Sequence, residues 1–80
     1  MMQDNIPRPV AWAIRRKVNP VTAFRIYCGL TEEALAAESG VPYYRVLAIE
    51  NGDPMTNVEA ARLSEVLDVP APLLRSKASI

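Results

Sequence analysis

The sequence has few of the side chains that catalytic and metal sites require. It contains no histidine and a single cysteine, Cys28, in 80 residues. A tetrahedral zinc site and a histidine-dependent nucleophile therefore cannot be built within one chain. No spacing of carboxylates suggests a magnesium site, so we expect no enzyme activity and no cofactor. The lone cysteine excludes an intrachain disulfide and fits a cytoplasmic protein.

Basic side chains offer a second kind of chemistry, the binding of phosphate. The net charge is zero, so there is no global attraction to nucleic acid. The charges are nevertheless uneven, with five basic residues and one acid up to Leu30, and four acids against one basic residue from Thr31 to Gly52. Three cations near the start are consecutive and either contact phosphate or lie on an ordinary solvated helix face: Arg15, Arg16 and Lys17.

The elements that would position such residues are short helices. Thr31 suits a helix N-cap, with Glu32 and Glu33 in a first turn that favours negative charge. Gly40 suits the left-handed residue that ends a helix, and Pro42 suits the first position of the next one. The small Ala36, with Val46 and Ile49 three residues apart, predicts two helices that cross closely, as in a helix-turn-helix.

This pattern resembles the helix-turn-helix of the phage-repressor-like, xenobiotic-response-element (XRE) family of DNA-binding regulators. The similarity covers about Asn19 to Leu74. The residues that carry it are Leu30-Thr31-Glu32-Glu33-Ala34-Leu35-Ala36, Ser39-Gly40-Val41 and Ile49-Glu50-Asn51-Gly52. The resemblance implies an all-α, five-helix repressor-type domain, here with a possible extra N-terminal helix.

The resemblance also implies which residues face DNA. The family's contact positions correspond here to Glu32, Pro42, Tyr43, Tyr44, Arg45, Leu47 and Ala48. Several are unusual for DNA binding, because Glu32 replaces a common glutamine and would repel phosphate, while Ala48 offers at most a methyl group. Tyr43, Tyr44 and Arg45 remain, since tyrosine can contact phosphate or a thymine methyl and arginine can hold guanine.

A structural pair is implied by the same resemblance. In family members an arginine at the position of Arg25 often bonds the glutamate at the position of Glu50, which ties the first helix of the domain to the third. Guanidinium and carboxylate can pair through two hydrogen bonds. The alternative is that both are unpaired surface charges.

The rest of the chain completes the domain. Val10 to Val18 has helical composition, and we expect Trp12 to be a core or dimer contact rather than a stacking residue for nucleic acid. Asn19 and Pro20 begin the next helix, in which Cys28 is expected in or near the core. Thr56 to Glu59 forms a capping box for the fourth domain helix. We therefore predict a tail and basic helix at 1–18, the DNA-binding domain at 19–75 and a tail at 76–80.

The predicted function is sequence-specific DNA binding by a small cytoplasmic transcription regulator. Two copies would form a homodimer on a short inverted repeat in double-stranded DNA. The alternative is a protein-interaction module, such as an antitoxin or an accessory subunit whose partner is a toxin, a sigma factor or polymerase. No apolar run approaches the length needed to span a membrane.

Overall fold

The described residues form six short helices and no strand. The structure is a computed structural model that describes residues 6–75. The all-α class expected from the sequence is confirmed, and an additional helix does precede the five of the expected domain. The predicted tails at 1–5 and 76–80 lie outside the described residues. The helices are α1 (Arg8–Arg15), α2 (Pro20–Tyr27), α3 (Glu32–Ser39), α4 (Tyr43–Glu50), α5 (Asn57–Leu67) and α6 (Ala71–Arg75).

Side-chain caps explain where three of these helices begin. The side chains of Asn19, Thr31 and Thr56 each accept a hydrogen bond from a backbone N–H in the first turn that follows, at 2.8–3.1 Å. Glu59 returns a bond to the N–H of Thr56, which completes the predicted capping box. These bonds satisfy amide groups that have no partner inside the helix.

The first helix differs from its predicted extent. α1 spans Arg8–Arg15, whereas the composition predicted a helix from Val10 to Val18. It starts earlier because Pro7 occupies its N-cap and Pro9 fits its first turn, where no N–H is needed. It ends earlier because Lys17 has a left-handed backbone, with φ of +71°.

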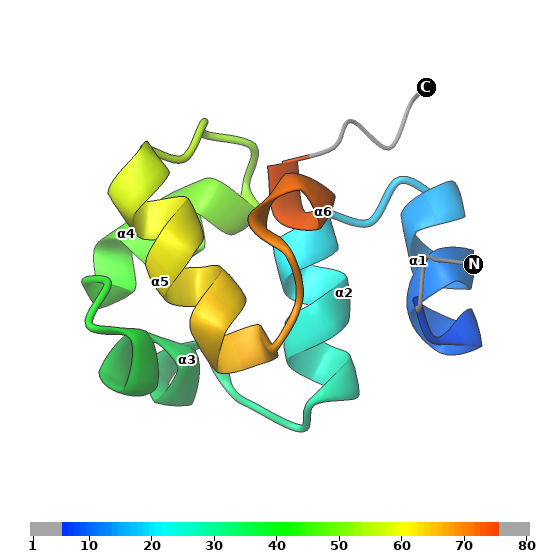
Figure 1. The fold of residues 1–80 in the computed structure, drawn as a ribbon, viewed down its shortest axis with the longest axis horizontal. Helices are drawn as coiled ribbons and strands as arrows, with labels where there is room; N and C mark the ends of the chain where they lie inside the picture. The colour runs from blue at the N-terminus through cyan, green and yellow to red at the C-terminus, as the bar shows by residue number, and fades with distance from the viewer. Residues whose placement is uncertain (1–5, 76–80) are drawn as a thin grey trace.

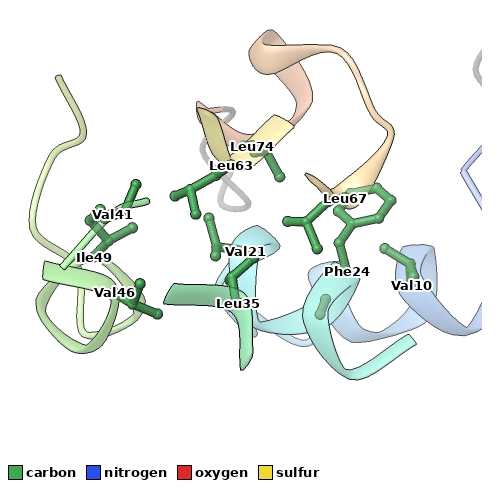
Figure 2. Packing of buried hydrophobic residues seen from close by; sticks show 11 residues of the cluster. Val10, Val21, Phe24, Leu35, Val41, Val46, Ile49, Leu63, Leu67 and Leu74 are labelled. Carbon is green, nitrogen blue, oxygen red and sulfur yellow. The ribbon is translucent and has the colours of Figure 1, made fainter. Parts of the chain in front are cut away.

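One apolar core joins all six helices. Figure 2 shows the cluster from Val41 and Ile49 at one end, through Val21 and Leu35, to Phe24 and Val10 at the other. Because α1 contributes Val10, which is 1% exposed, the leading helix is part of the folded domain. The buried cluster contains Val10, Val21, Ala23, Phe24, Leu35, Val41, Val46, Ile49, Leu63, Leu67 and Leu74.

The helices are spread along the longest axis of the molecule, which measures 32 Å. In Figure 1, α1 lies at one end beside α2, and α4 begins at the opposite end. α3 packs on both α4 and α5, and α2 contacts α4, α5 and α6. The first turn of α4 is therefore far from the end of α1, where Arg15, Arg16 and Lys17 follow one another.

Candidate nucleic-acid interface

The turn between α3 and α4 is tight and glycine-dependent. Gly40 has φ of +79° and donates its N–H to the carbonyl oxygen of Ala36 at 3.0 Å. A side chain at this position would be strained by that angle, and its Cβ would lie 3.1 Å from Nη1 of Arg62. Val41 follows and is 2% exposed, so the turn is anchored in the core. The two helices are thus held in one mutual orientation.

Two tyrosines project from the start of α4. Val46 and Ile49 face the core, while Tyr43 and Tyr44 are 44% and 70% exposed. Pro42, which is exposed, occupies the N-cap of α4, one residue earlier than predicted. Its ψ of 145° is extended rather than helical, so the prediction that it opens the helix was wrong. The predicted contact residues of this turn are nonetheless on the surface.

The far half of α4 is less accessible. Leu47 and Ala48 are both half-buried, although the resemblance placed them among the positions that face DNA. The surface that α4 offers a ligand is therefore concentrated in its first turn.

The predicted pair between α2 and α4 is present. Nε of Arg25 donates to Oε2 of Glu50 at 2.7 Å, and Nη2 donates to Oε1 at 3.2 Å. Nη1 donates to the carbonyl oxygen of Leu30 at 2.9 Å. The two side chains are only 13% and 6% exposed, and the hydrogen bond to Glu50 raises the pKa of Arg25. This pair fastens the end of α4 to α2 and to the loop before α3.

A second tie at the end of α4 was not anticipated. The side chain of Asn19 caps α2 through its oxygen and also donates from Nδ2 to the carbonyl oxygen of Ile49 at 3.0 Å. That carbonyl lies in the last turn of α4 and also accepts the backbone N–H of Gly52 at 3.0 Å, so Asn19 is its second donor. The asparagine therefore satisfies the start of one helix and the end of another.

Arg45 is held within the protein. Its guanidinium donates to both carboxylate oxygens of Glu59 at 2.8 and 2.9 Å and to the carbonyl oxygen of Pro54 at 3.1 Å. Asp53 lies 3.4 Å away. The hydrogen bonds from Arg45 lower the pKa of Glu59 to about 2. In this arrangement Arg45 joins α4 to α5, so it is not free to reach a guanine as the resemblance implied.

The sequence contained a partial signal for this pair. The capping box predicts that Glu59 lies in the first turn of a helix. No short sequence pattern, however, predicts that it pairs with an arginine 14 residues earlier. The pair exists because α4 and the start of α5 come together around the intervening loop.

Glu32 lies where two other charged groups converge. Its Oε2 is 3.8 Å from Nη2 of Arg25. The pKa of Glu32 is raised, mainly by its hydrogen-bonding interaction with Glu50. Arg25 is thus shared by Glu32 at the start of α3 and Glu50 at the end of α4. The negative charge of Glu32 is unfavourable at a position predicted to face phosphate.

The basic cluster is exposed and separate from the tyrosines. Arg15, Arg16 and Lys17 all lie on the surface at the end of α1, and none has a carboxylate within 4.0 Å among residues 6–75. The guanidinium of Arg16 stacks over the ring of Trp12, 4.3 Å from its centre. Figure 1 places this end of α1 on the opposite side of the molecule from the first turn of α4.

Two residues expected in or near the core are exposed. Trp12 is 59% exposed and packs with Arg16 rather than with the core, although a contact with a dimer partner stays a prediction. Cys28 follows the last turn of α2 and is also exposed. Trp12 lies two residues from both Val10 and Ile14, so helical spacing turns it away from the core. Cys28 is the C-cap residue just after α2, where the helical spacing of the buried stripe no longer applies.

The charges of the two halves are opposite. Residues 6–30 carry five basic groups and no acid. Residues 31–68, which contain the helix-turn-helix, carry two basic groups, Arg45 and Arg62, and eight acids. The acids are Glu32, Glu33, Glu38, Glu50, Asp53, Glu59, Glu65 and Asp68.

Other kinds of site are not apparent in the described part of the chain. No group of three or more His, Cys, Asp or Glu side chains between residues 6 and 75 is placed to hold a metal ion. No helix in that range has both the length and the apolar character needed to cross a membrane.

Comparisons of the chain with models of known protein families, with characterised proteins and with solved structures found no significant match. Function must therefore be argued from the residues and their geometry.

Proposed function

We propose that this protein is a small DNA-binding regulator that reads a short inverted repeat as a homodimer through α3 and α4. The observation that carries the proposal is the outward placement of Tyr43 and Tyr44 on a helix whose other face is locked into the core by Val46 and Ile49. A rigid helix with an exposed first turn is the arrangement that enters a DNA major groove.

The chemistry of the exposed turn suits DNA. A tyrosine hydroxyl can donate to a phosphate oxygen, and its ring can pack on a thymine methyl group. The Arg25–Glu50 pair and the bond from Asn19 to Ile49 hold the other end of α4. Because these bonds fix the position of α4 before DNA binds, less conformational entropy is lost on binding, which favours affinity.

The test is a binding titration of the purified protein against duplex DNA from upstream of its own gene, at moderate salt. We expect Tyr44→Ala to weaken binding on the order of tenfold. Tyr27→Ala is the matched control, because Tyr27 is also exposed, at 54%, but lies at the end of α2. Equal losses in the two variants, or no binding by the wild-type protein, would contradict the proposal. Circular dichroism verifies that both variants are folded.

A second candidate is favoured by the acidic charge around the helix-turn-helix. Eight acids against two basic groups in residues 31–68 oppose the approach of phosphate. In this alternative the protein is an antitoxin or accessory subunit, and the tyrosines of α4 contact a protein. Binding to DNA only when a partner protein is added would favour this candidate, whereas binding by the protein alone favours the first.

A further inference from the structure

Three helices in this protein end with the same pair of backbone hydrogen bonds. At the end of α2, Gly29 donates its N–H to the carbonyl oxygen of Ile26, three residues earlier, at 2.9 Å. Leu30 donates its N–H to the carbonyl oxygen of Arg25, five residues earlier, at 3.1 Å. Gly52 is in the same position after α4. After α1 the position is taken by Lys17, whose N–H donates to Ile14 at 2.8 Å while Val18 donates to Ala13 at 3.0 Å. This pattern requires a left-handed residue and normally selects glycine.

A lysine in this position is strained. Its φ of +71° brings the Cβ close to the backbone carbonyl, which glycine avoids. Asparagine and aspartate can compensate through local hydrogen bonds, but the lysine side chain has no acceptor with which to do so. Among residues 6–75 the other non-glycine residue with this geometry is Asp68, after α5.

The position of Lys17 connects it with α4. Lys17 lines a groove of about 700 Å³ that is also bordered by the end of α4 and by Asn51 and Gly52 of the following loop. Arg75 of α6 adds a second cation to the same groove, and Glu50 and Asp53 add two carboxylates to its lining. The nearby Asp53 is 3.4 Å from Arg45, and no described carboxylate is within 4.0 Å of the lysine ammonium. Lys17 is therefore the member of the basic cluster that lies beside the end of the proposed recognition helix.

The dimensions match a DNA duplex. An eight-residue helix is about 12 Å long, and the major groove is about 12 Å wide. A helix of this length that lies across the groove has a phosphate strand beside each of its ends, so one strand is next to the last turn of α4. That is the end of α4 at which the groove with Lys17 opens.

We propose that Lys17 binds a backbone phosphate of the DNA that α4 reads, and that its left-handed backbone is a loss of stability retained for that contact. This inference rests on the proposed function. The ammonium group of Lys17 would supply positive charge beside a helix-turn-helix whose own surroundings are acidic.

The experiment compares melting temperature and salt-dependent binding for three variants. Lys17→Gly removes both strain and charge, so it raises the melting temperature by about 4 °C while weakening binding several-fold. The slope of log affinity against log salt falls by about one unit, as expected for the loss of one phosphate contact. Lys17→Asn removes the charge with a residue that tolerates this geometry, and it gives the same change in slope. Asp68→Gly relieves strain elsewhere and raises the melting temperature without weakening binding.

The outcomes separate this proposal from the one on which it rests. If Tyr44→Ala loses binding while Lys17→Gly keeps the wild-type affinity and salt slope, the role of Lys17 is wrong and the function of α4 stands. If the wild-type protein binds no duplex, both proposals are wrong. Loss of binding in Lys17→Gly accompanied by a lower melting temperature would also overturn the inference, because the left-handed lysine would then be stabilising.

Discussion

Two arginine–glutamate pairs hold α4, one at each end, and they differ in how well water is excluded. At the end of the helix, Arg25 and Glu50 are 13% and 6% exposed and join α4 to α2. At its start, Arg45 and Glu59 are 23% and 15% exposed and join α4 to α5. Both pairs use two hydrogen bonds, so the main physical difference between them is the surrounding solvent.

The difference has a consequence for each end of the helix. A buried charge that loses its partner stays poorly hydrated, whereas an exposed charge that loses its partner is hydrated by solvent. Both ends of α4 are thus held, and the last turn should be held more strongly than the first. The exposed tyrosines belong to the first turn, beside the more solvated of the two pairs.

The largest effect expected is from breaking the buried pair. Glu50→Ala should lower the free energy of unfolding by about 3 kcal/mol, because the mostly buried Arg25 would lose two hydrogen bonds and keep only the more distant Glu32, at 3.8 Å, as a counter-charge. The loss from Glu59→Ala should be smaller. Urea denaturation measures both.

A double-mutant cycle across each pair gives the stricter comparison, since it isolates the coupling from other effects of truncation. Coupling between Arg45 and Glu59 as large as that between Arg25 and Glu50 would mean that burial does not distinguish the two ends.

The next largest effect expected is a loss of stability at acidic pH. Because Arg45 depresses the pKa of Glu59 from 4.5 to about 2 in the folded protein, the bound proton favours the unfolded chain. The stability due to this carboxylate is complete above pH 4.5 and is lost as the pH falls from 4.5 to about 2. Thermal melts across this range should show a falling melting temperature.

The variant Glu59→Gln is the control for the acid effect. This variant should be less stable than wild type at pH 7, and its stability should decrease less on acidification. Parallel profiles for the two proteins would show that another carboxylate dominates the acid transition.

The smallest effect expected is from Glu32→Gln. The pKa of Glu32 is raised by Glu50, so its charge opposes folding at neutral pH. The substitution should produce a small rise in melting temperature at pH 7, and this gain should disappear once the wild-type carboxyl is protonated. Removing the charge should also tighten DNA binding, since α3 would no longer repel phosphate. Weaker DNA binding in this variant would indicate that Glu32 itself contacts the ligand.

Local patterns predicted much of the fold correctly. The caps at Asn19, Thr31 and Thr56 and the left-handed Gly40 depend on a few neighbouring residues, so the sequence was sufficient to place them. The Arg25–Glu50 pair was expected from the resemblance and is present. The exposure of Trp12 differs from the expected core or dimer contact, because Trp12 lies two residues from both Val10 and Ile14 and so faces away from the core of this protomer.

The sequence by itself determined the helices, their caps and the all-α class, because these follow from hydrogen bonds and apolar spacing over a few residues. Tertiary structure alone decided that Arg45 pairs with Glu59, that Asn19 also bonds Ile49, and that Lys17 lies beside the end of α4. Each of these arrangements brings together residues that are far apart in the sequence, so it depends on how the helices pack, which no local pattern encodes.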